Sequence, residues 1–131
     1  GATAFQRGLG AMHALAHPLG ALYDAHHGML NAILMPYVLQ ANRAVIEDGC
    51  TRLARYLDLP QPSFASLLKW VLDLRKTVGI PHSLAEIGID AGQAELVGRM
   101  AVVDGSAGTN PIQFSADQYA AILRNAVSGR L

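Results

Sequence analysis

Apolar residues recur along this chain at intervals of three and four, and no stretch alternates apolar with polar residues as a half-buried strand does. Such spacing places the apolar side chains on one face of a helix. The chain has 131 residues, of which 51% are hydrophobic, a size and composition that suit one globular domain. The sequence therefore predicts an all-α fold, a bundle-like domain of six or seven helices that occupies residues 1–131.

The first predicted helix carries an apolar stripe, and Pro18 with Gly20 is expected to end it. At about 100° per residue, one face gathers four apolar side chains, Phe5, Leu9, Met12 and Ala16. His13 and His17 follow along the edge of that stripe, where the core of a domain meets a cleft.

A buried helix is predicted next, because residues 29–39 are apolar on nearly every face. Pro36 within it predicts a kink or a restart. The helical pattern then continues to Gly49, and residues 51–59 form a separate short helix that two prolines stop. Cys50, between these two segments, is predicted to be a small buried side chain rather than a nucleophile, since no basic partner is near it in the sequence.

The later helices begin at residues that can cap a helix N-terminus. Ser63 caps a helix that ends at Gly79. Two further pairs have the three-residue spacing of a capping box, Asp90 with Gln93 and Ser115 with Gln118. Residues 104–111, between the last two helices, are rich in turn-forming residues and are predicted to form a loop.

Charge and composition argue against several classes of partner. Ten acidic and ten basic residues give a formal net charge of zero, so no basic surface for a nucleic acid is expected. No apolar run approaches the ~20 residues that cross a membrane. A single cysteine cannot form an internal disulfide, and it fits a reducing, cytoplasmic setting.

Four of the five histidines fall between residues 13 and 28, in a segment otherwise rich in Ala, Leu and Gly. His13 and His17 are four residues apart, so their rings project from one face of a helix and can chelate one metal ion. His27 lies past a proline and a glycine that let the chain turn back, and it could return a third nitrogen. A stable metal site needs about four donors, and no carboxylate in the sequence has a spacing that would bring it to these histidines. The sequence therefore predicts only part of a metal site.

The other polar residues of this region have simpler interpretations. Two histidines four residues apart can also be solvated or bonded to carbonyl groups. His26, next to His27, is predicted to point elsewhere and is assigned no role. Asp24 is the only acid among these histidines and is expected to be a turn residue rather than a ligand. His82 follows a proline in a loop and is expected to be a surface residue.

A long segment, residues 8–42, resembles the signature region of the iron-containing (group III) alcohol dehydrogenases; it reads GLGAMHALAHPLGALYDAHHGMLNAILMPYVLQAN. In that family a helix carries His-x-x-x-His-x-x-Gly, a His-Gly turn follows, and the next helix contains Asn-Ala-Ile-Leu-x-Pro. The matching positions are His13, His17, Gly20, His27, Gly28, Asn31, Ala32, Ile33, Leu34, Pro36 and Asn42. Residues 78–81, 84–88 and 104–111 are similar to later segments of the family, so the resemblance covers nearly the whole chain.

The resemblance implies a two-domain enzyme in which a divalent ion, usually iron and sometimes zinc, lies between a dinucleotide-binding domain and a helical domain. Two of the ion's histidine ligands match His13 and His27. His17 matches a residue beside the nicotinamide and the substrate that assists proton transfer. Ile112 stands where the family often has Arg, and His26 where many members have Pro, which leaves the subfamily and its substrate open.

Part of the family's machinery is absent from this sequence. The Asp-x-x-x-His helix that supplies the other two metal ligands does not occur, nor does the Gly-rich phosphate-binding loop. Residues 1–7 begin without an initiator Met or a signal-peptide pattern and read as the middle of a helix. Both observations predict that the chain is a fragment of a longer enzyme.

We therefore expect the C-terminal helical part of an NAD(P)-dependent alcohol dehydrogenase that interconverts small alcohols with aldehydes or ketones. Its partners would be the substrate and the enzyme's own N-terminal dinucleotide-binding domain, and the isolated chain is expected to be inactive. The sequence leaves open a homo-oligomer, NAD versus NADP, and iron versus zinc. Two alternatives are a stand-alone helical metal-binding module that uses His13, His17 and His27, and a non-catalytic interaction domain.

Overall fold

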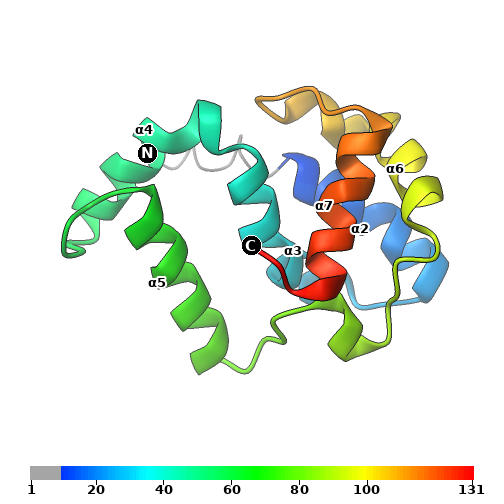
Figure 1. Ribbon diagram of the computed structural model, residues 1–131, viewed down its shortest axis with the longest axis horizontal. Coiled ribbons are helices and arrows are strands. Elements are labelled where there is room, and N and C mark those ends of the chain that lie inside the picture. The colour runs from blue at the N-terminus through cyan, green and yellow to red at the C-terminus, as the bar shows by residue number, and fades with distance from the viewer. Residues whose placement is uncertain (1–9) are drawn as a thin grey trace.

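The computed structural model describes residues 10–131, and that part of the chain contains helices and no strands (Figure 1). Its α-helices are α2 (Gly10–Tyr23), α3 (His27–Ala41), α4 (Arg43–Tyr56), α5 (Phe64–Thr77), α6 (Ala94–Val102) and α7 (Ala116–Ser128). Two short 3₁₀ helices are η1 (Leu84–Ile87) and η2 (Gly105–Thr109). The all-α prediction is confirmed for these residues. None of their helices is long and apolar enough to cross a membrane.

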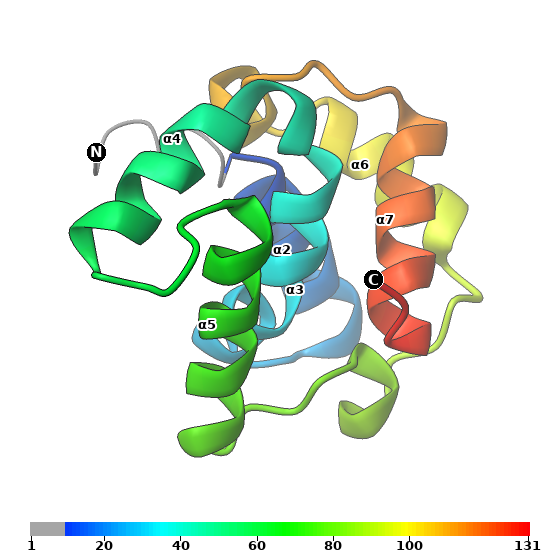
Figure 2. The same cartoon turned by 60° about the vertical axis from the view of Figure 1, so that its left-hand side comes forward.

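Helix α3 is the central element of the structure. In Figure 1 it lies between α4 and α5 on one side and α2, α6 and α7 on the other, and Figure 2 shows α5 and α7 on opposite sides of it. The larger group of buried apolar side chains joins α2, α3, α6 and α7. The smaller joins α4, α5 and the end of α3, where Leu39 lies. Met35 of α3 packs against both groups, so this helix connects the two cores.

Local capping signals account for two of the three helix starts that the sequence predicted. Ser63 forms a capping box at the start of α5, and Ser115 forms one with Gln118 at the start of α7. The capping box predicted at Asp90 is wrong. Its Oδ1 accepts a hydrogen bond from the backbone N–H of Gly92 at 2.8 Å, which closes a turn before the helix begins.

Helix α2 continues through Pro18 and Gly20 to Tyr23, so the predicted end of this helix is wrong. Pro18 is buried, and the next residue, Leu19, is fully buried in the larger core. Packing of this face offsets the N–H that the proline removes from the helix. The stripe predicted for this helix includes Phe5 and Leu9, which lie outside the described residues.

The next boundary also differs from the prediction. Helix α3 runs unbroken through Pro36, and the chain then breaks at Asn42 rather than at Gly49. One helix, α4, covers the two segments predicted on either side of Gly49. Cys50 and Ala54 are buried in the smaller core, and their packing holds the helix across the glycine.

Arg75 of α5 compensates for the proline inside α3. Pro36 has no backbone N–H, so the carbonyl of Ala32, four residues earlier, loses its helical donor. Nη1 of the buried Arg75 donates to the Ala32 carbonyl oxygen at 3.3 Å and to that of Ile33 at 3.1 Å. The guanidinium therefore replaces the missing bond and ties α5 to α3 at the proline.

Candidate active site

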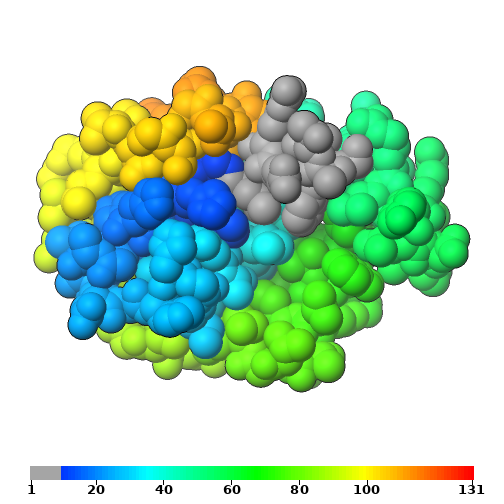
Figure 3. Space-filling model, turned by 180° about the vertical axis from the view of Figure 1, so that it is seen from behind, coloured from blue at the N-terminus to red at the C-terminus, as the bar shows by residue number. Residues whose placement is uncertain are grey.

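Three of the predicted site residues come together where α2 meets α3. His13 and His17 lie one turn apart on α2, and His27 is the first residue of α3. Measured between centroids, the His27 ring lies 5.2 Å from the His17 ring and 6.2 Å from the His13 ring, and it is nearly parallel to both. Figure 3 shows the segments that carry them, in blue and light blue, side by side on one face. Which of these histidines binds a metal stays a prediction.

The chain reverses between the two helices over residues 24–26. Asp24 has a φ of 51°, in the left-handed region, so it is the turn residue that the sequence predicted. His26 caps α3, because its Nδ1 accepts a hydrogen bond from the backbone N–H of Met29 at 3.3 Å. The prediction that His26 has no role is therefore wrong. Its ring satisfies one of the N–H groups that a helix leaves unpaired at its start.

His13 is the least exposed of the three clustered histidines. Burial lowers the pKa of His13, and the neighbouring His27 and His17 lower it further because protonated rings would repel one another. The negative charge of the Asp104 carboxylate raises the pKa of His13, but by less. The net effect favours the neutral imidazole, which is the form that binds metal ions.

The structure adds Asp104, a residue that the sequence did not single out. Its Oδ2 lies 2.8 Å from Nδ1 of His17, which is 87 positions away in the chain. Its Oδ1 accepts a hydrogen bond from the backbone N–H of Ser106, also at 2.8 Å. Burial by itself would raise the pKa of the Asp104 carboxyl, but the bonds from Ser106 and His17 outweigh it and lower the pKa. Asp104 is therefore an ionised acceptor beside His17.

The predicted loop over residues 104–111 contains η2, which packs closely on α2. Gly10 of α2 lies so near this segment that a Cβ on it would come within 2.6 Å of Oγ1 of Thr109. This close approach brings Asp104 to His17. Asp-Gly-Ser signals a local turn in the sequence, but nothing in that signal identifies a partner so far away in the chain.

The described part of the chain does not contain a complete metal donor set. Within residues 10–131, no group of three or more His, Cys, Asp or Glu side chains is arranged to hold a metal ion. Cys50 is buried in the smaller core, as predicted. Burial and the nearby Glu47 raise the pKa of its thiol, so this cysteine is neither a ready ligand nor a nucleophile.

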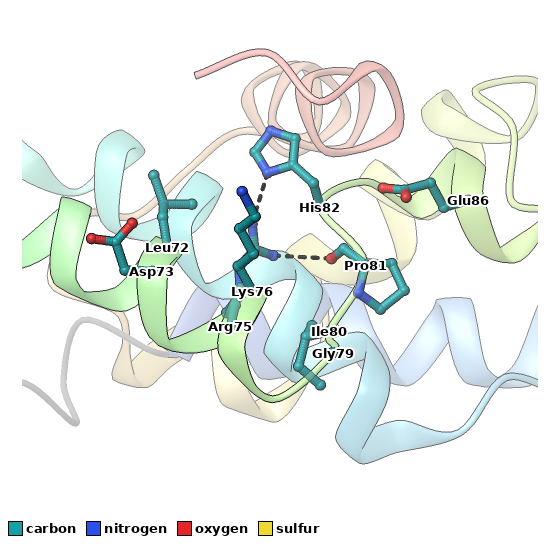
Figure 4. A pocket seen from close by; sticks show the side chains of 9 residues that line it. All are labelled: Leu72, Asp73, Arg75, Lys76, Gly79, Ile80, Pro81, His82 and Glu86. Carbon is teal, nitrogen blue, oxygen red and sulfur yellow. Dashed lines mark hydrogen bonds between the residues drawn. The ribbon is translucent and has the colours of Figure 1, made fainter.

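A hollow of about 570 Å³ opens beside α5, and none of the clustered histidines lines it. Figure 4 shows His82 above Arg75 and Lys76 in this hollow. His82 is exposed, as predicted, but both of its ring nitrogens are bonded. Because a guanidinium can only donate, Nδ1 accepts from Nη2 of Arg75 at 2.9 Å and Nε2 donates to the Gly129 carbonyl, also at 2.9 Å. This ring is a structural link between α5 and the end of α7.

The sequence matches a known family over almost its whole length. A family model described as the Fe-containing alcohol dehydrogenase family, C-terminal, covers residues 2–127. The chain belongs to this family. The resemblance that rested on the histidine segment is thus confirmed, and the helical domain is the C-terminal domain of iron-containing alcohol dehydrogenases.

Individual members of the iron-containing alcohol dehydrogenase family show how much of such an enzyme this chain represents. It is 38% identical to 4-hydroxybutyrate dehydrogenase of Cupriavidus necator, over 97% of this chain and 35% of that protein. It is 32% identical to 1,3-propanediol dehydrogenase of Klebsiella pneumoniae, over 90% and 32% of the two chains. The crystal structure of a 1,3-propanediol oxidoreductase superposes with a TM-score of 0.83 at 30% identity, over 88% of this chain and 32% of that one. The chain spans about a third of the length of these relatives.

Proposed function

We propose that this chain is the C-terminal helical part of an NAD(P)-dependent, iron-containing alcohol dehydrogenase that interconverts a small alcohol and its aldehyde or ketone. The observation that carries the proposal is the convergence of His13, His17 and His27 in a chain of this family. Relatives named for 4-hydroxybutyrate and 1,3-propanediol suggest short alcohols with a second polar group as the substrate class.

In this proposal His13 and His27 hold a divalent ion, iron or zinc. Imidazoles whose centroids lie 6.2 Å apart can each direct one nitrogen at a single ion. Two nitrogens are half of a donor set, and no third donor completes it within residues 10–131. The remaining ligands would come from the part of the enzyme outside this chain. When bound, the ion supplies a Lewis acid for the alcohol or carbonyl oxygen.

His17 is assigned to proton transfer rather than to the ion. Ring separation alone does not support this division, because His17 lies closer to His27 than His13 does. The hydrogen bond to Asp104 supports it. A carboxylate only accepts, so Nδ1 of His17 carries the proton and Nε2 is left as a base.

The rest of the reaction belongs to the N-terminal dinucleotide-binding domain of the enzyme. That domain would bind NAD or NADP, which accepts the hydride, while this chain forms the opposite wall of the site. We place the enzyme in the cytoplasm, because a single buried thiol suits a reducing compartment.

The experiment that tests this function compares the full-length protein with the isolated chain. Both are supplied with Fe²⁺ and assayed for oxidation of 1,3-propanediol and 4-hydroxybutyrate with NAD and with NADP. We expect turnover by the full-length protein only. No turnover with either cofactor would contradict the proposed activity, and turnover by the 131 residues alone would contradict the fragment proposal. Tight Zn²⁺ or Fe²⁺ binding by the isolated chain, measured by calorimetry, would favour the metal-binding module instead.

A further inference from the structure

We propose that Asp104 is the positioning residue that fixes the imidazole of His17, with its proton on Nδ1 and its Nε2 lone pair available to a substrate proton. This inference rests on the proposed function, in which His17 handles the proton of the alcohol. It assigns to Asp104 the role of fixing the orientation and the tautomer of His17.

Both oxygens of the Asp104 carboxylate accept a hydrogen bond. Oδ1 accepts from the backbone N–H of Ser106 at 2.8 Å, and Oδ2 accepts from Nδ1 of His17 at 2.8 Å. The Ser106 bond fixes the carboxylate within its own turn, so it cannot rotate away from His17 without losing an N-cap. The Asp104 side chain is 18% exposed and the His17 side chain 49% exposed, so the carboxylate is sheltered while the imidazole reaches solvent.

The opposite edge of the His17 ring is left open. Within the described part of the chain, its only hydrogen bond is the one to Asp104. The ring of His27 stacks on the His17 ring, and the two ring planes are inclined by 17° to each other. His82 provides a contrast, because Arg75 and Gly129 occupy both of its nitrogens and fix the opposite tautomer. Of these two fixed imidazoles, only His17 has a nitrogen free for chemistry.

The proton step balances with groups already named. The O–H bond of the alcohol breaks, and its proton forms an N–H bond on Nε2 of His17. The C–H bond on the carbon that bears this oxygen also breaks. Its hydride passes to the nicotinamide, and the carbon becomes a carbonyl carbon. Asp104 keeps its charge throughout and stabilises the imidazolium, as the carboxylate does in a Ser-His-Asp triad. The proton then passes from Nε2 to solvent.

Asp104→Asn tests this assignment without changing the shape of the side chain. The Ser106 N–H needs an oxygen, so the amide oxygen of the new side chain stays on Ser106 and its NH₂ group faces His17. An NH₂ group can only donate, which forces Nδ1 to accept and moves the ring proton to Nε2. Asp90→Asn is the matched control, because Asp90 closes the same kind of turn on Gly92 and contacts no histidine.

The primary measurement is a long-range ¹H–¹⁵N correlation spectrum of the histidine rings in the isolated chain, at about pH 8. We expect His17 protonated on Nδ1 in the wild type and in the Asp90 variant, and on Nε2 in the Asp104 variant. His82 should be protonated on Nε2 in all three chains, and ring chemical shifts of His82 that stay at their wild-type values, set by Arg75 and Gly129, show that each variant is folded. A wild-type His17 protonated on Nε2 would overturn the proposal even if the Asp104 variant does not fold.

The second measurement uses the metal-loaded full-length protein. We expect Asp104→Asn to lower kcat by about 10²- to 10⁴-fold, the usual contribution of a general base, with KM and bound metal unchanged. Normal kcat in this variant together with an inactive His17→Ala enzyme would overturn the role of Asp104 alone. Normal kcat in His17→Ala would instead refute the proposed function on which the inference rests.

Discussion

The side chains of Asn42 and Asn110 form two reciprocal hydrogen bonds across 68 positions of the chain. Nδ2 of Asn42 donates to Oδ1 of Asn110 at 2.9 Å, and Nδ2 of Asn110 donates to Oδ1 of Asn42 at 2.8 Å. Oδ1 of Asn110 also accepts from the backbone N–H of Ala11 at 3.0 Å. One buried amide pair thus joins the start of α2, the end of α3 and the segment after η2, the elements that bring the clustered histidines and Asp104 together.

Asn110→Ala is expected to lower the free energy of unfolding by at least about 2 kcal/mol, because a buried polar group that loses a hydrogen-bond partner costs about 1–3 kcal/mol. The groups affected are the amide of Asn42 and the N–H of Ala11, both buried. Urea unfolding measures the change. Thr109→Ala is the control, since that exposed hydroxyl donates only to the neighbouring Ser106 carbonyl and its loss should cost far less. Equal losses in the two variants would refute the importance of the amide pair.

Gly98→Ala tests the contact between α6 and α7. A Cβ on Gly98 would overlap the backbone carbonyl oxygen of Ala116, and a backbone group cannot rotate away as a side chain can. We expect the two helices to move apart and thermal unfolding to show a loss of about 1–3 kcal/mol or more. Gly105→Ala is the matched control, because a Cβ at that position meets nothing within 4 Å. A Gly98 variant as stable as the control would mean that this packing adjusts without strain.

Acid should weaken the fold partly through Glu86. The hydrogen bond from the backbone N–H of Ser83, at 2.9 Å, lowers the pKa of Glu86 below its ordinary value of 4.5. A carboxyl whose pKa is lower in the folded state stabilises the fold above its unfolded pKa, and this contribution disappears as pH falls through the folded pKa. The wild-type free energy of unfolding should therefore fall more steeply below about pH 5 than that of Glu86→Gln. Parallel losses of stability in the wild type and in Glu86→Gln below that pH would contradict this contribution of Glu86.

His13→Ala and His27→Ala are each expected to strip the metal from the full-length enzyme, because in the proposed site each residue is one of about four ligands. Metal content by inductively coupled plasma mass spectrometry is the readout. His26→Asn is the control, since it removes an imidazole next to His27 and replaces it with a residue that also caps helices. Full metal content in the His27 variant would refute its assignment as a ligand.

His17→Ala should have the opposite phenotype. The variant is expected to keep its metal and to lose about 10²- to 10⁴-fold in kcat, the range typical of a general acid or base. Measuring metal content and turnover on the same preparation separates the two roles. Loss of metal from this variant would make His17 a ligand and would contradict the division of the cluster proposed above.

Local signals were enough to predict much of this fold. Ser63 and Ser115 cap helices because the groups they bond lie within three residues. The turn at Asp24 and the burial of Cys50 were likewise evident from neighbouring residues. The spacing of His13, His17 and His27 also pointed to one cluster before any distance was known.

The predictions that were wrong concern residues whose partners lie far away or in another core. Pro36 does not break α3, because Arg75 supplies the missing donor from 43 positions away. Gly49 does not end a helix, because the smaller core holds α4 together. Asp104 and Asn110 were read only as loop residues, since nothing in a single sequence pairs a turn residue with a histidine or an amide in another helix.

The hydrogen bond from Arg75 to the Ala32 carbonyl, which Pro36 leaves without a helical donor, also affects how the domain unfolds. If α5 detaches, the Ala32 carbonyl inside α3 loses its donor, and α3 is the helix that both cores share. The larger core therefore cannot keep its central helix intact while the smaller one melts. Residues 10–131 should open as a single cooperative unit in native-state hydrogen exchange, and the α3 amides should become unprotected together with those of α5.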